Sequence, residues 1–498
     1  MASAIRTKIV TYMRRTKILA TLGPATDDPK VMDRVIEAGV DVVRINFSHG
    51  THQEHQDRAD KVRNRARAHG RQVGVLCDLQ GPKIRIERFK NGKITLNEGD
   101  TFILDTALDS GAGDQQRVGM AYKDLPQDVK RGDTLLLDDG RLVFWVDSVE
   151  GNEVRCRVVV GGELSDRKGL NRQGGGLSAP ALTDKDRVDI KAAAQMQADY
   201  LAVSFPRSAA DIEEARELLK AAGGHAHIVA KIERADALNH LEEIIMASDV
   251  IMIARGDLGV EIGDAALPPV QKRLISMSRT LNRVVITATQ MMESMIYSQI
   301  PTRAEVFDVA NAVLDGTDAV MLSAETATGK YPDKAIEAMD RICQEAEKQR
   351  SVMRSDHRID TTFTRIDEAI AMATMYTANH LGVKAIAALT ESGDTTRWMS
   401  RISSGIPIYA LTHYVETRRK VTLYRGVYPV SFELTDEDRS KVFKEAVDEL
   451  LRRGAVRDGD LIIITRGAMM GVIGGTNSMT ILRVGDLDKP IDPAELVQ

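Results

Sequence analysis

The sequence predicts an α/β protein whose main domain is a closed (β/α)₈ barrel, with a β-rich insertion and a second α/β domain after the barrel. Eight short apolar segments recur between residues 17 and 323, and helical segments alternate with them. This alternation stops only at 83–178, where turn residues separate β-type segments. Eight βα units are the number that closes a barrel, whereas the rival doubly wound open sheet usually has fewer strands.

The predicted barrel strands follow one another in a regular order. They cover residues 17–23, 40–48, 72–79, 199–205, 227–233, 249–254, 284–289 and 318–323. The first helix should begin at residues 26–29, because a polar cap precedes a proline in the first turn, and Gly39 should end it. This regular order indicates a TIM-type barrel.

A fresh α/β run begins after Asp356. Its predicted strands cover residues 384–390, 406–412, 427–432, 460–467 and 479–484, which indicates a small domain with a mainly parallel sheet. The expected organisation is an N-terminal tail at 1–15, a TIM-type barrel at 16–82 and 179–356, an inserted β-barrel at 83–178, and a C-terminal α/β domain at 357–498.

Composition excludes several classes of function. The net charge is −5, so no basic field points to a nucleic-acid partner. No apolar run approaches the ~20 residues of a membrane span, and the N-terminal segment lacks the apolar core of a signal peptide. Three cysteines far apart in the sequence form neither a disulfide framework nor a metal-ligand pattern. We therefore expect a cytoplasmic protein without nucleic-acid or membrane partners.

Polar side chains gather where the predicted barrel strands end. Barrel enzymes keep their chemistry at the carboxyl ends of the strands. Residues i and i+2 of a strand share a face, so Lys231 and Glu233 point into one space. A lone pair of this kind can be a structural ion pair, but polar groups recur at the same end: Arg44, Asn46, Ser48, Asp78, Ser204, Asp257, Thr289, Ser323 and Glu325.

These residue types favour chemistry on an anionic substrate. Glu233 and Asp257, without cysteine or histidine partners, suit a hard divalent cation such as Mg²⁺. A lysine beside the cation and an arginine opposite suit a reaction that gathers negative charge, such as phosphoryl transfer. Two alternatives stay open at this point. A Schiff-base aldolase would need a free lysine, and a non-catalytic sensor would be expected to lose site residues.

Several long motifs make the resemblance specific. The chain is similar to the pyruvate kinase family in RINFSHGT (44–51), CDLQGPKIR (77–85), AKIER (230–234), ARGDLG (254–259), TATQMMESM (287–295) and the segment 301–332. The resemblance implies transfer of the phosphoryl group of phosphoenolpyruvate to ADP, giving pyruvate and ATP in the last step of glycolysis. It also implies that the insertion is a lid over the barrel and that the protein is a homotetramer.

The resemblance further implies a role for each matching residue. Lys231 would neutralise charge on the transferring phosphoryl group and the developing enolate, and Glu233 and Asp257 would hold Mg²⁺ or Mn²⁺. Catalytic roles are expected for Lys231, Arg44, Thr289 and Arg85, with the two arginines on phosphate. The substrate-binding set adds Ser204, Gly256 and Asp257, and the nucleotide-binding set is Asn46, His49, Arg85 and Lys185.

A monovalent-cation site is also implied, with one departure. Ligands in K⁺-dependent relatives match Asn46, Ser48, Asp78 and the main-chain carbonyl of Leu79. K⁺-requiring relatives carry an acidic residue where this chain has Lys83. An ammonium on a flexible stem can supply the same charge, so we expect K⁺ not to be required. The alternative is that Lys83 only points to solvent.

The C-terminal domain contains a loop that resembles the effector site of the family. Its candidate residues, within the segment 390–397, are Thr390, Ser392, Gly393, Thr395 and Thr396. The glycine-rich segment 465–478 would cover the ligand. It lacks the tryptophan and arginine that help relatives bind a second phosphate. We therefore expect a sugar monophosphate, glucose 6-phosphate or ribose 5-phosphate, with AMP less favoured. The alternative is an ordinary capped turn.

Overall fold

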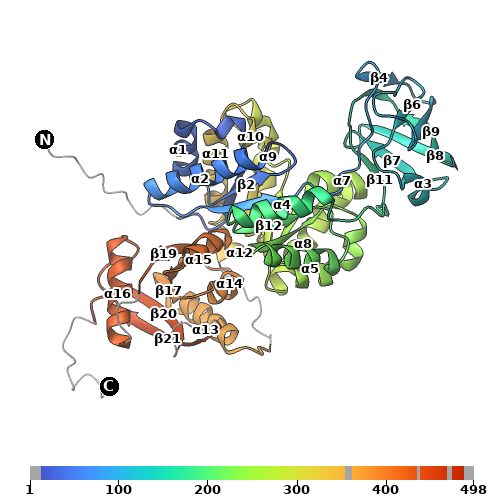
Figure 1. Ribbon diagram of the computed structural model, residues 1–498. Helices are drawn as coiled ribbons and strands as arrows, with labels where there is room; N and C mark the ends of the chain where they lie inside the picture. The colour runs from blue at the N-terminus through green and yellow to red at the C-terminus, as the bar shows by residue number, and fades with distance from the viewer. Residues whose placement is uncertain (1–12, 354–361, 434–437, 468–473, 487–498) are drawn as a thin grey trace. The chain divides into compact units, whose positions relative to one another are not determined.

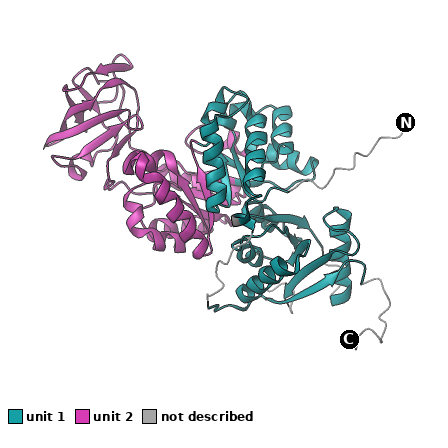
Figure 2. Cartoon of the chain, turned by 180° about the vertical axis from the view of Figure 1, so that it is seen from behind, with its two compact units in different colours: residues 1–44, 58–75, 291–498 teal, residues 45–57, 76–290 magenta. Residues whose placement is uncertain are grey.

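The computed structural model describes residues 13–353, 362–433, 438–467 and 474–486 (Figure 1). The chain divides into two compact units, one of residues 1–44, 58–75 and 291–498 and the other of residues 45–57 and 76–290 (Figure 2). Most of the expected N-terminal tail lies outside the described residues. None of the described helices is long and apolar enough to cross a membrane.

Eight parallel strands form the predicted closed barrel, in the order β1-β16-β15-β14-β13-β12-β3-β2. Their residues are almost all buried, because parallel strands covered on both faces need continuous apolar sequence. The strands are Lys17–Thr21 (β1), Val42–Asn46 (β2), Gly74–Asp78 (β3), Tyr200–Val203 (β12), His227–Ile232 (β13), Val250–Ala254 (β14), Val284–Ala288 (β15) and Ala319–Leu322 (β16). The barrel prediction is confirmed.

Helices follow the barrel strands, and the first of them begins at its predicted cap. The Asp28 carboxylate accepts a hydrogen bond of 2.8 Å from the Lys30 amide, and Pro29 occupies the first turn, as expected. The helices are Pro29–Glu37 (α1), His52–Ala68 (α2), Asp184–Gln195 (α4), Ala209–Ala221 (α5), Leu241–Ala247 (α6), Arg255–Ile262 (α7), Leu267–Thr280 (α8), Arg303–Asp315 (α9), Ala324–Ala327 (α10), Pro332–Ala346 (α11) and Arg350–Met353 (α12). Two helices, α7 and α8, therefore follow β14.

The expected β-rich insertion is present and forms a six-stranded mixed sheet and a two-stranded sheet. The larger is a mixed sheet in the order β11-β7-β8-β9-β5-β6, and β10 pairs with β4 in the smaller. The elements are Lys93–Leu96 (β4), Thr101–Asp105 (β5), Arg117–Gly119 (β6), Leu125–Asp128 (α3), Thr134–Leu137 (β7), Leu142–Glu150 (β8), Glu153–Val160 (β9), Gly162–Ser165 (β10) and Leu170–Arg172 (β11). Phe102 and Phe144 pack in its own core with ring centroids 5.7 Å apart.

The C-terminal domain has the mainly parallel sheet that was predicted, in the order β19-β18-β17-β20-β21, with only β21 antiparallel. The strands are Ala385–Leu389 (β17), Ile408–Thr412 (β18), Val427–Ser431 (β19), Leu461–Gly467 (β20) and Thr476–Arg483 (β21), and the helices are Ile366–Leu381 (α13), Asp394–Ser400 (α14), Val415–Lys420 (α15) and Arg439–Arg452 (α16). Residues 468–473 of the expected covering segment lie outside the described residues.

One buried ion pair joins the C-terminal domain to the barrel. Arg401, which follows α14, is 0% exposed, and Asp318, which precedes β16, is 1% exposed. The guanidinium donates 2.8 Å from Nη1 to Asp318 Oδ2, and its Nη2 also contacts Oδ1. A planar guanidinium matches a carboxylate in this two-bond geometry. The pair therefore fixes the end of α14 against the start of a barrel strand.

Replacing Asp318 by alanine should destabilise the protein strongly, because it leaves the Arg401 charge buried without this partner. Breaking a buried pair in this way typically costs about 3–5 kcal/mol. The free energy of unfolding in urea measures the loss. The matched control is Glu337→Ala, which removes the half-exposed pair with Lys334 and should cost less than about 1 kcal/mol. Equal losses in the two variants would contradict the assignment.

Candidate functional site

Lys231 lies in a buried cluster at the carboxyl ends of three neighbouring barrel strands. Its ammonium is 2.9 Å from Glu233 Oε1 and 3.2 Å from Asp78 Oδ1, and it donates a hydrogen bond of 2.7 Å to Ser204 Oγ. Lys231 belongs to β13, Ser204 follows β12 and Asp78 ends β3, and these strands are consecutive in the barrel. The structure thus brings these four predicted residues together.

The negative charge around Glu233 is greater than its lysine partner, Lys231, can neutralise. It is 3% exposed, and burial raises the pKa of its carboxyl to about 7, with Asp257 and Asp78 adding to the rise and Lys231 opposing it. Its second oxygen accepts a hydrogen bond of 3.0 Å from the Phe205 amide. A further cation near Glu233 would stabilise the ionised carboxylate.

The backbone is strained where two barrel strands, β12 and β15, end. Phe205 follows β12 with φ of 55°, and Thr289 and Gln290 follow β15 with φ of 66° and 54°. Bulky and β-branched residues rarely adopt this left-handed conformation. Strain of this kind persists only where surrounding contacts impose it, and it collects at functional sites. These two turns are therefore held in shape by the rest of the site.

Arg255 supplies one of the contacts that hold the Thr289 turn. Its guanidinium donates hydrogen bonds to the Thr289 carbonyl, at 2.7 Å from Nη2, and to the Ala288 carbonyl, at 3.2 Å from Nε. The Thr289 hydroxyl in turn accepts 2.8 Å from the Gly256 amide. No role was predicted for Arg255 from the sequence, although its place directly before Gly256, at the first turn of α7, was the available signal.

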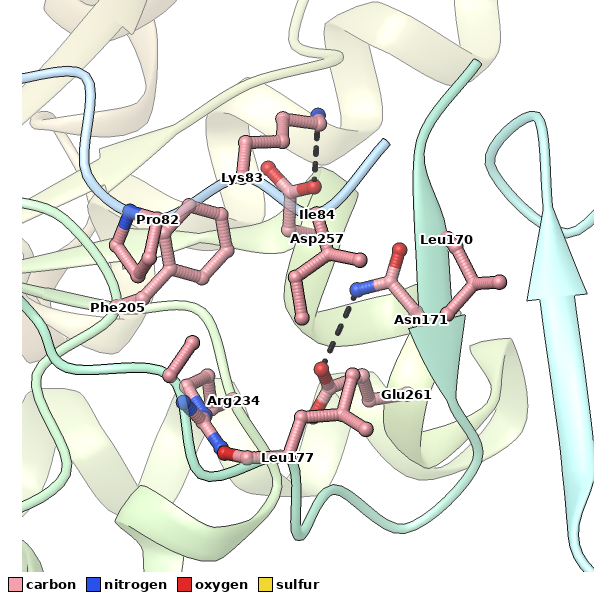
Figure 3. Close-up of a pocket in the computed structure, with 11 residues that line it drawn as sticks. Pro82, Lys83, Ile84, Leu170, Asn171, Leu177, Phe205, Arg234, Asp257 and Glu261 are labelled. Carbon is pink, nitrogen blue, oxygen red and sulfur yellow. Dashed lines mark hydrogen bonds and ion pairs between the residues drawn. The ribbon is translucent and has the colours of Figure 1, made fainter. Parts of the chain in front are cut away.

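Lys83 reaches the site from the segment that leads into the insertion. Its ammonium is 3.1 Å from Asp257 Oδ1, and both side chains are about a quarter exposed. Figure 3 shows this contact above a small pocket lined by both residues and by the return segment of the insertion. The alternative that Lys83 only points to solvent is therefore wrong for the described structure.

Three of the four predicted nucleotide residues, Asn46, His49 and Lys185, lie beside Phe47. The Lys185 ammonium donates 2.7 Å to the Phe47 carbonyl and 2.5 Å to the buried Asp189 carboxylate. Asn46 Oδ1 accepts 3.1 Å from the Ser48 amide, and the exposed His49 follows in the same turn. The same loop region and α4 line an open cavity of about 420 Å³. Asp189 was not predicted from the sequence as a partner of Lys185.

Two predicted arginines are held by partners outside the Lys231 cluster. Arg44 Nη1 donates 3.2 Å to the Thr21 hydroxyl on the neighbouring strand. Arg85 Nη1 donates 2.9 Å to the Arg167 carbonyl, within the insertion. Ser323 and Glu325 belong to the first compact unit, where Glu325 accepts hydrogen bonds from the Ser323 amide at 2.7 Å and the Met292 amide at 3.2 Å.

Hydroxyl side chains of the candidate effector loop form hydrogen bonds that hold the loop in shape. Thr390 Oγ1 accepts 2.9 Å from the Gly393 amide, and Thr396 Oγ1 donates 2.7 Å to the Gly393 carbonyl. Ser392 Oγ donates 2.9 Å to Asp394. The Thr395 hydroxyl lies 2.7 Å from that of Thr476, in β21. The loop is therefore tied to Thr476, which lies at the end of the expected covering segment 465–478.

The donor set fits a divalent cation that binds oxygen. Among the described residues no three histidine, cysteine or acidic side chains form a complete metal cluster. Asp257 lies close enough to Glu233 to help raise the pKa of the Glu233 carboxyl. Carboxylates alone favour Mg²⁺ or Mn²⁺, with substrate and water oxygens completing the shell. These two residues could hold the ion.

The fold and the site together define a (β/α)₈-barrel phosphotransferase. Lysine and carboxylates converge at the carboxyl ends of the strands, where barrel enzymes act. The pairing of Lys231 with two carboxylates makes it a charged ammonium, unlike the free amine that a Schiff base requires.

Comparison with known proteins identifies the family. Family models for "Pyruvate kinase, barrel domain" and "Pyruvate kinase, alpha/beta domain" match residues 13–336 and 368–482. Pyruvate kinase II of Salmonella typhimurium is 56% identical over 95% of this chain and 99% of its own length, and pyruvate kinase of Haemophilus influenzae is 55% identical over 91% and 96%. The chain therefore belongs to the pyruvate kinase family.

A solved structure agrees with this assignment. The crystal structure of a pyruvate kinase from Cryptosporidium parvum superposes with a TM-score of 0.88 at 33% sequence identity. The superposition covers 95% of this chain and 96% of that one. The expected resemblance is thus confirmed for both the sequence and the fold.

Proposed function

We propose that this protein transfers the phosphoryl group of phosphoenolpyruvate to ADP, giving pyruvate and ATP as in the last step of glycolysis. The observation that carries the proposal is the buried Lys231 ammonium between the carboxylates of Asp78 and Glu233. In the reaction, the bond between phosphorus and the enol oxygen breaks while phosphorus bonds to a terminal oxygen of ADP. Negative charge then remains on the enolate, which takes up a proton to become pyruvate.

The chain's own groups suit this charge transfer. The Lys231 ammonium would stabilise the charge on the phosphoryl group and on the enolate. The amides of Gly256 and Asp257, at the first turn of α7, and the Thr289 hydroxyl would bind the substrate carboxylate. Glu233 and Asp257 would hold Mg²⁺ or Mn²⁺, which, when bound, would screen the charge of the phosphate and carboxylate.

The remaining polar residues would bind phosphate groups and the nucleotide. We assign phosphate contacts to Arg44 and Arg85, a substrate contact to Ser204, and nucleotide contacts to Asn46, His49, Arg85 and Lys185. The half-exposed Lys185 side chain supports its role, because it lines the open cavity while Asp189 and the Phe47 carbonyl hold its ammonium in place. The insertion would act as a lid that excludes water from the transferred phosphoryl group.

The Lys231→Met variant tests this function. The unmodified enzyme should form pyruvate from phosphoenolpyruvate and ADP in a coupled assay with Mg²⁺. Removing the ammonium should lower kcat by at least about 100- to 1000-fold, the usual loss for one preorganised donor. Lys220→Met, which removes an exposed lysine of α5, is the control and should keep full activity. Near-normal turnover in folded Lys231→Met protein would refute the assignment.

We propose that the enzyme needs no K⁺. The residues Asn46, Ser48, Asp78 and Leu79 match a monovalent-cation site, but the contact of Lys83 with Asp257 supports a built-in positive charge. A second cation about 4 Å from this ammonium would meet repulsion of about 4 kcal/mol at an effective dielectric of 20. The protein's own ammonium would then take the place of the ion.

Activity should be complete in K⁺-free tetramethylammonium buffer of constant ionic strength. The variant Lys83→Glu should lose activity in that buffer and regain it when K⁺ is added, because the variant replaces the built-in cation by a carboxylate. The exposed Lys90→Glu, elsewhere in the insertion, should show neither effect. Strong stimulation of the unmodified enzyme by K⁺ would overturn the proposal.

We propose that a sugar monophosphate activates the enzyme at the loop 390–397. Four hydroxyl side chains and the Gly393 amide gather there and could bind one phosphate group: Thr390, Ser392, Thr395 and Thr396. The tie between Thr395 and Thr476 supports a coupling of this loop to the covering segment. Glucose 6-phosphate and ribose 5-phosphate are the preferred candidates, ahead of AMP.

Titration calorimetry with each sugar phosphate should detect binding to the unmodified protein. Ser392→Asp should abolish both binding and activation, because its carboxylate repels the phosphate. Ser440→Asp, at the exposed start of α16 in the same domain, should leave both unchanged. Absence of monophosphate binding, or unchanged activation in Ser392→Asp, would show that the loop is only a capped turn.

We also propose a homotetramer in the cytoplasm. Large apolar side chains in and before α9 support self-association, since Tyr297, Ile300 and Phe307 are each at least 70% exposed. The three cysteines, Cys77, Cys156 and Cys343, are all buried and form no disulfide, which supports a reducing compartment.

A further inference from the structure

Glu261 binds two chain segments that come from different parts of the same unit. The side chain lies in the last turn of α7 and is 5% exposed. Its Oε1 accepts 3.2 Å from Asn171 Nδ2, on β11 of the insertion (Figure 3). Its Oε2 accepts 2.8 Å from the Ala235 amide, beyond the end of β13. The Glu261 carbonyl also accepts 3.0 Å from the Gly174 amide. One residue thus fastens the return segment of the insertion.

The other end of α7 holds the outgoing segment of the insertion. Lys83, on that segment, contacts Asp257 in the first turn of the helix. Asp257 and Glu261 are four residues apart, so they lie on the same face of one rigid helical turn, and both line the pocket of Figure 3. Both connections of the insertion therefore end on α7, one at each end.

The same helix carries the proposed substrate cradle. Gly256 and Asp257 occupy its first turn, and Ala235, which Glu261 holds, lies two residues after Glu233. Arg234 adds a contact between the same segments, because its guanidinium donates to the Leu177 carbonyl and to the Asp236 carboxylate. A shift of the return segment would thus be transmitted to the cradle and to the segment after Glu233.

We propose that Glu261 is a positioning residue, which couples the insertion to the orientation of Gly256 and Asp257 by holding Asn171 and Ala235 together. This inference rests on the proposed function of the cradle. It goes beyond that function because it gives a positioning role to a carboxylate that takes no part in the proposed phosphoryl transfer. Small displacements of a catalytic group can cost about 100-fold in rate.

A side-chain exchange tests the coupling. In Asn171→Asp two carboxylates face each other, so this variant loses the hydrogen bond between positions 171 and 261. In Glu261→Gln the contact is kept, because the Asn171 amide can turn over so that its oxygen accepts from the new amide. In the double variant, the amide at position 261 donates to the carboxylate at position 171 and still accepts from Ala235. We expect kcat to fall about 10- to 100-fold in Asn171→Asp, to change less than about threefold in Glu261→Gln, and to return within about threefold of the unmodified enzyme in the double variant.

Hydrogen exchange gives a readout that does not depend on the reaction. In Asn171→Asp, exchange should quicken in residues 171–177 and also in α7, and the double variant should reverse both changes. Glu242→Gln, an exposed glutamate of α6, is the control for both measurements. Normal kcat in Asn171→Asp, faster exchange confined to 171–177, or a folded double variant without recovery would each overturn the inference. Absence of pyruvate formation by the unmodified enzyme would count against the proposed function alone, and the exchange pattern would still decide the coupling.

Discussion

The buried Lys231 ammonium is the interaction on which the candidate site depends. Asp78, Ser204 and Glu233 come from three consecutive strands, and all three meet at this one nitrogen. Carboxylates buried without a cation would be costly, and each would be driven toward its neutral form. The lysine therefore stabilises the close approach of the strand ends. The register of the barrel strands places its ammonium level with the side chains of Asp78, Ser204 and Glu233.

The cluster has an excess of negative charge, which favours the binding of a cation. Three carboxylates, Asp78, Glu233 and Asp257, share the two ammonium groups of Lys231 and Lys83. The raised pKa of Glu233, about 7, reflects burial together with this excess of negative charge. A divalent ion would balance the charge, while α7 and the strained Thr289 turn hold the proposed substrate cradle of Gly256, Asp257 and Thr289 in place. Charge and geometry are thus prepared before substrate arrives.

Much of this arrangement could be predicted, because strand periodicity is a local pattern and the number of βα units indicates a closed barrel. The spacing of Lys231 and Glu233 alone predicts that they share a face, and barrel closure brings Asp78 and Ser204 to the same end. The two-sheet form of the insertion, by contrast, depends on which edges pair across long loops. The contacts of Lys83 with Asp257 and of Asn171 with Glu261 span 174 and 90 residues, and no sequence pattern encodes such pairs.

Crystals grown with Mn²⁺ and examined by anomalous diffraction would test the central claim most directly. The account predicts a strong peak within about 2.0–2.5 Å of carboxylate oxygens of both Glu233 and Asp257, the range for oxygen ligands of such ions. The peak should vanish in crystals of the Glu233→Gln variant. A peak at other residues, or one that persists unchanged in the variant, would contradict the claim that Glu233 and Asp257 together hold a divalent cation.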